Sequence, residues 1–133
     1  MITQVKVRDE VFFTVNRPPV EFILGFPAQQ ITVRECIRTR VYHEVEEYNA
    51  HRPGAFQGLI QPTEAEQTLN GYRLPKNHRI NPEAQFQKAL VAFERNGFLM
   101  LVDDRQVEQL DDIITLGSST VITFLKLVPL VGG

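Results

Sequence analysis

The sequence predicts an α+β protein, because strand-like segments open and close it and two helical patterns lie between them. Residues 4–15 and 20–24 are rich in β-branched and aromatic side chains, and so are residues 98–102 and 120–128. With 133 residues, of which 43% are apolar, the chain suits one domain that buries roughly two thirds of its unfolded surface. We therefore expect a single domain over residues 1–133.

The opening strands are expected to form an antiparallel pair. Residues 4–15 combine alternation with an apolar run, and the two prolines in residues 16–19 fix φ and remove two amide donors. The chain then returns as a second strand over 20–24.

A helix is predicted over residues 33–49. Its start is a capping box, Thr32-Val-Arg-Glu35, and Pro53 and Gly54 are stop signals just beyond its end. Apolar residues at steps of four and three mark one face that we expect to pack on a sheet: Val33, Ile37, Val41, Val45 and Tyr48.

The middle of the chain is the least regular part. Residues 56–60 are typical of a short edge strand, and a second capping box, Thr63-Glu-Ala-Glu66, predicts a short helix over 64–70. Asn81 with Pro82 predicts the start of a third helix, over 83–95. The apolar stripe of that helix is Phe86, Leu90 and Phe93.

The last third is predicted to be β structure again. Strand 98–102 is followed by the turn residues Asp103-Asp104 and by a return over 105–108. Residues 117–119 are a further turn before the closing strand, 120–128.

A short tail, residues 129–133, follows the closing strand. Pro129 has no amide to donate and so ends strand pairing. Gly132-Gly133 would occur by chance about once in two hundred sequences at ordinary glycine usage. Together they predict a tip that presents the carboxylate of Gly133 away from the fold.

Composition argues against several other functions. The net charge is −2 with a pI near 5.9, and the arginines are scattered, so no nucleic-acid surface is expected. No window approaches the ~18 apolar residues of a membrane span, and no leader pattern opens the chain, which indicates a cytoplasmic protein. Cys36, the single cysteine, is interpreted as a small buried hydrophobe. We find no metal motif, no nucleophile paired with a base and no phosphate-binding loop, so the protein is not expected to be an enzyme.

The order of elements resembles the ubiquitin-like β-grasp fold. The segments that carry the resemblance are Val102-Asp-Asp-Arg-Gln-Val107, residues 113–124 and the tail Pro129-Leu-Val-Gly-Gly133. They are similar to the sulfur-carrier and ubiquitin-related modifier branch, which includes the small subunit of molybdopterin synthase and the thiamine sulfur carrier. The resemblance implies a mixed sheet packed on a helix, here with an inserted helical segment at about 50–96, as in a bacterial-type ubiquitin-like protein.

The resemblance also implies a function, in which the Gly133 carboxylate reacts with ATP held by an activating enzyme. The acyl-adenylate would pass to a cysteine of that partner and then to an amine of a target protein, making the chain a protein modifier. A conjugating enzyme and a metallopeptidase are further implied partners, and the chain itself would need no cofactor. Two alternatives stay open: a sulfur carrier with a C-terminal thiocarboxylate, and a β-grasp binding module that is not conjugated.

The implied site residues lie in the tail and the last strand. Gly132 and Gly133 are the acyl-donor tail, and the activating enzyme would bind Leu127, Val128, Pro129, Leu130 and Val131.

A partner surface is also predicted on the closing strand, because both of its faces are apolar. Residues 121, 123, 125 and 127 point one way and residues 122, 124 and 126 the other, while the helix over 33–49 can cover only one face. Either the third helix covers the second face, which we favour, or that face binds partners. The candidate partner patch is Ile122, Phe124 and Lys126.

Overall fold

The computed structural model describes residues 2–12, 18–68, 71–76 and 78–127. It is an α+β structure with two helices and a five-stranded mixed sheet, consistent with a β-grasp-like fold, as predicted. The chain divides into two compact units, Met1–Cys36 with Phe93–Gly133 and Ile37–Ala92.

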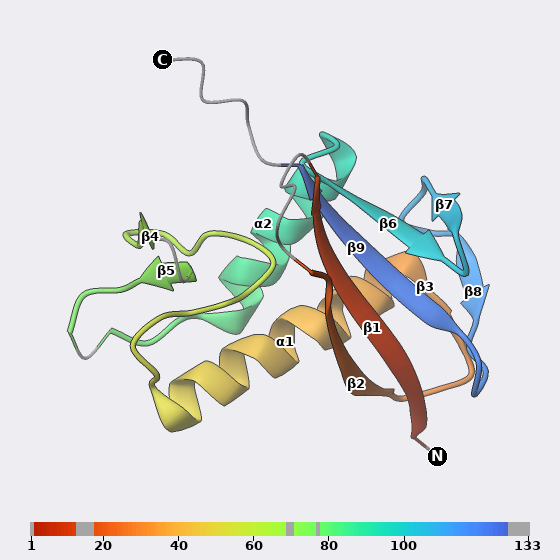
Figure 1. Cartoon of the computed structure of the whole chain (residues 1–133), viewed down its shortest axis with the longest axis horizontal. Coiled ribbons are helices and arrows are strands. Elements are labelled where there is room, and N and C mark those ends of the chain that lie inside the picture. The colour runs from red at the N-terminus through yellow and green to blue at the C-terminus, as the bar shows by residue number, and fades with distance from the viewer. Residues whose placement is uncertain (1, 13–17, 69–70, 77, 128–133) are drawn as a thin grey trace. The chain divides into compact units, whose positions relative to one another are not determined.

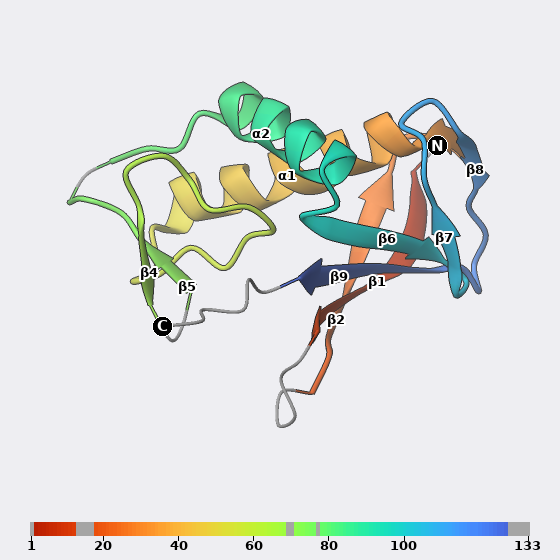
Figure 2. The ribbon, with the colours of Figure 1, turned by 90° about the horizontal axis from the view of Figure 1, so that it is seen from above.

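The first unit is built on the sheet of order β2-β1-β9-β6-β7. Figures 1 and 2 both show β9 between β1 and β6. β1 runs parallel to β9, and every other neighbouring pair is antiparallel. The bounds are β1 (Thr3–Phe12), β2 (Val20–Phe26), β6 (Phe98–Val102), β7 (Arg105–Val107) and β9 (Val121–Leu127).

One face of this sheet forms the apolar core of the first unit. In the register Val7 pairs with Ile122 and Phe124 with Met100, and paired residues point to the same face. The Phe98 ring lies 5.9 Å from Phe93 and 6.0 Å from Phe124, between ring centroids. The buried side chains of this face are Val5, Val7, Leu24, Phe26, Phe98, Met100, Ile122 and Phe124.

A small two-stranded sheet, β3 (Gln30–Thr32) with β8 (Ile113–Thr115), leads into helix α1 (Val33–His51). The Val33 amide donates to the Asp112 carbonyl at 2.9 Å, so the chain beside β8 satisfies an amide that the helix cannot. The Thr32 hydroxyl accepts from the Glu35 amide at 3.1 Å. This bond confirms the predicted helix start.

The second unit contains most of α1, the hairpin of β4 (Glu66–Thr68) and β5 (Gly71–Arg73), and most of α2 (Pro82–Glu94). The Asn81 side chain accepts from the Ala84 amide at 2.9 Å, so Asn81 is the predicted N-cap of α2. The predicted apolar faces of both helices are buried: Ile37, Val41 and Val45 on α1, and Phe86 and Leu90 on α2.

Two local predictions in the second unit are wrong. The segment predicted as helix 64–70 is a strand at Glu66–Thr68, and Glu64 has φ of 68°, which no right-handed helix accepts. No periodic apolar run follows the second capping box, so nothing favours a helix there. Of the predicted strand 56–60, Phe56 alone pairs, in an isolated bridge to Tyr72. Residues 69–70 lie outside the described residues.

The prediction of one domain with an insertion at 50–96 stays a prediction. The second unit begins within α1, at Ile37, and ends at Ala92 within α2. None of the helices in the described part of the chain has both the length and the apolar character that crossing a membrane requires.

Candidate functional site

The predicted site is centred on β9, which occupies the middle of the sheet. It pairs with β1 on one side and β6 on the other, and the Leu127 amide at its end donates to the Gly97 carbonyl at 3.4 Å. Leu127 is half-buried. The remaining predicted tail residues lie outside the described residues: Val128, Pro129, Leu130, Val131, Gly132 and Gly133.

The candidate partner patch on β9 is corrected by the structure. Ile122 and Phe124 are both 0% exposed, and they pair in register with Val7 and Met100 inside the core of the first unit. Lys126 shares their face at the end of the strand and is half-buried. Alternate residues of β9 point to opposite faces of the sheet, and both groups are largely apolar. The sequence of the strand therefore does not decide which group forms the core.

Residues 121, 123, 125 and 127 of β9 point to the opposite face of the sheet, which we call the second face. Leu125 pairs with Leu99 and Thr123 with Leu101, so these side chains lie together on the face opposite Ile122. Thr123 is buried, whereas the apolar residues around it are half-buried: Leu99, Leu101, Val121, Leu125 and Leu127. Several large apolar side chains are therefore partly exposed on this face, whereas Ile122 and Phe124 of the predicted patch are not.

The second face is charged on its β1 and β2 side. Arg8 pairs in register with both Thr123 and Glu21, and its guanidinium donates two hydrogen bonds, of 3.0 and 2.8 Å, to one Glu21 oxygen. This hydrogen bonding lowers the pKa of Glu21 and raises that of Arg8. The second face therefore has an apolar strip on β6 and β9 and an ion pair beside it on β1 and β2.

The aspartates that could be mistaken for catalytic groups are structural. Asp103 and Asp104 have φ of 49° and 68°, values typical of a tight hairpin turn. The Asp103 carboxylate accepts from the Val121 amide at 2.9 Å, which holds this turn to the start of β9. Cys36 is fully buried, as predicted. Among the described residues, no three His, Cys, Asp or Glu side chains come together as metal ligands.

A groove in the second unit was not predicted from the sequence. It has a volume of about 800 Å³ and lies between the end of α1, residues 53–57 and the β4-β5 hairpin. His43, Glu47 and His51 line it at intervals of four residues along α1, a spacing visible in the sequence. The opposite wall comes from residues that only folding brings near.

No protein-family model matches the chain, and comparisons with curated proteins and with solved structures also gave no match.

Proposed function

We propose that the protein is a ubiquitin-like modifier, whose Gly133 carboxylate is activated by a partner enzyme and transferred to amines of target proteins. The observation that supports this proposal is the position of β9. It is the central strand, parallel to β1, and the sequence Pro129 to Gly133 begins two residues beyond its end. A tail that follows a central strand is attached to the most firmly held part of the sheet.

The chemistry requires little from the chain itself. An ionised α-carboxylate, with a pKa near ~3.5, attacks the α-phosphate of ATP and releases pyrophosphate, which leaves an acyl-adenylate on Gly133. A cysteine thiolate of the activating enzyme then displaces AMP to form a thioester. A target amine displaces the thiolate, loses a proton and forms the amide bond. Glycine suits these steps because no Cβ hinders the carbonyl.

The second face of the sheet would bind the activating enzyme. Leu125 and Leu127 on β9 lie on that face, so an enzyme that holds the tail also reaches the strip beside the Arg8–Glu21 pair. A conjugating enzyme and a metallopeptidase are the further proposed partners. We place the reaction in the cytoplasm, because it needs ATP and a reduced cysteine.

The proposal is tested with the cognate activating enzyme, identified by capture from cells that make the protein. Intact mass measured on protein from those cells first establishes whether Gly133 carries the free carboxylate. With ATP, the enzyme should then form a thioester to the chain that is lost on removal of Gly133 and retained in the surface variant Thr63→Ala. A mature protein that ends elsewhere, or one that forms neither adenylate nor thioester with any captured enzyme, contradicts the proposal.

The same experiment separates the alternatives. An amide bond to a target lysine identifies a modifier, whereas exchange of a terminal oxygen for sulfur identifies a sulfur carrier. Binding to partners through the second face without any reaction at Gly133 identifies a β-grasp binding module.

A further inference from the structure

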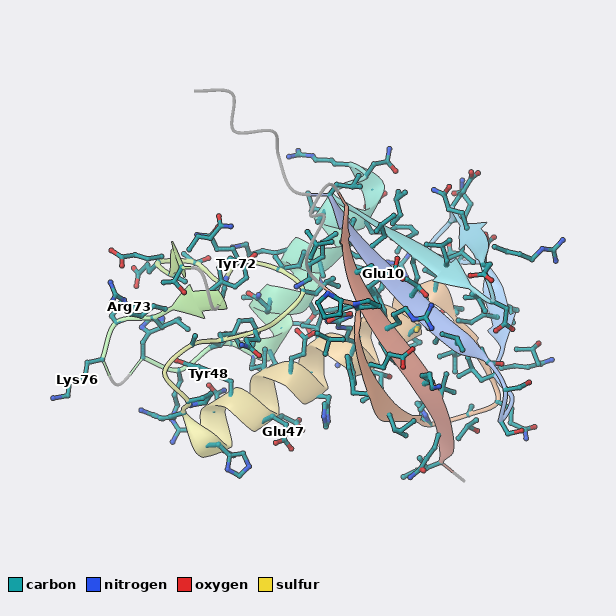
Figure 3. The ribbon with its side chains drawn as sticks, viewed as in Figure 1. Glu10, Glu47, Tyr48, Tyr72, Arg73 and Lys76 are labelled. Atoms are coloured by element: carbon teal, nitrogen blue, oxygen red, sulfur yellow. The ribbon has the colours of Figure 1, made fainter. Side chains whose placement is uncertain are left out.

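The groove in the second unit carries an inference that is independent of the tail chemistry. α1 supplies Glu44, Glu47 and Tyr48 to its lining, and β5 supplies Arg73. Figure 3 labels Glu47 and Tyr48 on α1 and Arg73 on β5. The remaining lining residues are His43, His51, Pro53, Gly54, Ala55, Phe56, Gln57 and Thr68. Every lining residue belongs to the same compact unit.

Two of the charged side chains in the groove are already engaged. Glu44 accepts hydrogen bonds from the buried Arg40 guanidinium and from the Leu59 amide. Arg73 forms an ion pair with Glu66 at 2.6 Å. Neither side chain is therefore available to a ligand without loss of an existing interaction.

Glu47 is in a different situation. Its side chain is 59% exposed, and the ion-pair partner that the structure gives it is His51 Nε2 at 3.4 Å, which carries charge only when protonated. Among the described residues, no lysine or arginine forms an ion pair with Glu47, so its charge is available to a ligand. With histidine counted as neutral, the charges of Glu44, Glu47 and Arg73 and of their partners Arg40 and Glu66 sum to one negative charge.

Two further features favour a cation at this position. Glu47 and Tyr48 lie in the last two turns of α1, which ends at His51, and the end of a helix carries partial negative charge. The Tyr48 ring, half-buried, packs edge-to-face on Phe56, with centroids 5.4 Å apart and an interplanar angle of 87°. An aromatic ring held in this way attracts a cation and contacts the methylene stem that carries it.

The shape of the groove indicates how the cation arrives. It is open, whereas sites for small molecules bury most of the surface of the ligand. A side chain that belongs to a longer segment needs no such enclosure, since the rest of that segment adds contacts outside the groove. We propose that this groove binds a lysine or arginine side chain from a basic segment of a partner protein, with Glu47 as its charge partner and Tyr48 as its aromatic wall.

The probe for this proposal is the peptide acetyl-Lys-Lys-Lys-amide, titrated into the full-length protein and followed through backbone amide NMR shifts. The shifts should centre on Glu47, Tyr48 and the segment 53–57. The same peptide with all three lysines Nε-acetylated has equal length and no side-chain charge, and should bind at least tenfold more weakly. No activating enzyme is involved, so the result is separate from that of the proposed function.

Glu47→Gln and Glu46→Gln form a matched pair of variants. Both remove one negative charge from exposed positions on α1, but Glu46 does not line the groove. Glu47→Gln should weaken the lysine peptide at least fivefold, while Glu46→Gln changes its affinity by less than twofold. Equal losses in the two variants would show general attraction to an acidic helix and overturn the proposal. Shifts located elsewhere, or equal binding of the acetylated peptide, would overturn it too.

Discussion

Arg40 is the most deeply buried charged residue that the structure describes, with 1% of its side chain exposed. A buried charge is tolerated when it is paired, and Arg40 donates through Nε to one oxygen of Glu44. The other Glu44 oxygen accepts from the Leu59 amide at 3.1 Å. Glu44 therefore connects α1 to the loop that follows it. The same loop needs glycine at position 58, where a Cβ would lie 2.2 Å from the Phe56 ring.

Replacing this carboxylate should be costly. Glu44→Ala removes the group that compensates Arg40 and leaves the Leu59 amide without its acceptor, so we expect the free energy of unfolding to fall by about 3 kcal/mol. Denaturant unfolding measures the change. Glu46→Ala, two residues along the same helix but exposed, should change it by less than about 0.5 kcal/mol. Equal effects of the two changes would mean that the buried pair contributes no more than a surface carboxylate.

At the scale of single elements, the chain contains two Thr-x-x-Glu boxes with different outcomes. Thr32 caps α1, whereas Thr63 precedes a strand and its hydroxyl accepts a hydrogen bond of 3.4 Å from the Lys88 amine. The first box is followed by apolar residues at helical spacing and the second is not. A capping box therefore sets where a helix starts only when a periodic face follows it.

The two threonines give a direct comparison. Thr32→Ala removes the acceptor of the Glu35 amide and should lower the free energy of unfolding by about 1 kcal/mol. Thr63→Ala removes no cap and should change it by less than about 0.5 kcal/mol. Thermal and denaturant unfolding of both variants provide the measurement. A loss at Thr63 as large as that at Thr32 would contradict this account.

Sequence patterns located the long elements and the short strand β7, and missed the other short strands. The predicted helix 33–49 starts where α1 starts and ends only two residues before it. The agreement is close because the apolar periodicity runs along most of the helix. The three-residue strands β3, β4, β5 and β8 are too short to show a period, and β4 and β5 exist through pairing with each other. At the candidate site, alternation in β9 was clear, but its register with β1 and β6 decides that Ile122 points inward.

At the scale of the whole molecule, the chain passes between its two compact units inside helices. The first crossing is at Cys36 in α1 and the second at Ala92 in α2. Helix formation is cooperative, so separating the units by unfolding one of them requires breaking both helices. The two units are therefore expected to unfold together, as the prediction of one domain requires.

Leu90→Ala tests this coupling. Leu90 is a buried residue of the second unit, and its truncation should lower the free energy of unfolding by about 2–5 kcal/mol. Hydrogen exchange should show that the amides of β1 and β9 in the first unit lose the same amount of protection as those of α1. The exposed neighbour Val91→Ala is the control and should have little effect. Unchanged protection in β1 and β9 would mean that the units unfold separately.

The parallel ladder between β1 and β9 has a mechanical consequence. Lys6 pairs with Val121 and Val11 with Lys126, so the first and last strands of the fold run side by side in one direction. A force that pulls on the start of β1 and the end of β9 acts along both strands in opposite senses and loads the bonds of the ladder together. Such a shear load is harder to relieve than peeling, in which bonds break one after another. A cellular machine that pulls on the end that follows β9 while the start of β1 is held would therefore have to break this ladder in shear.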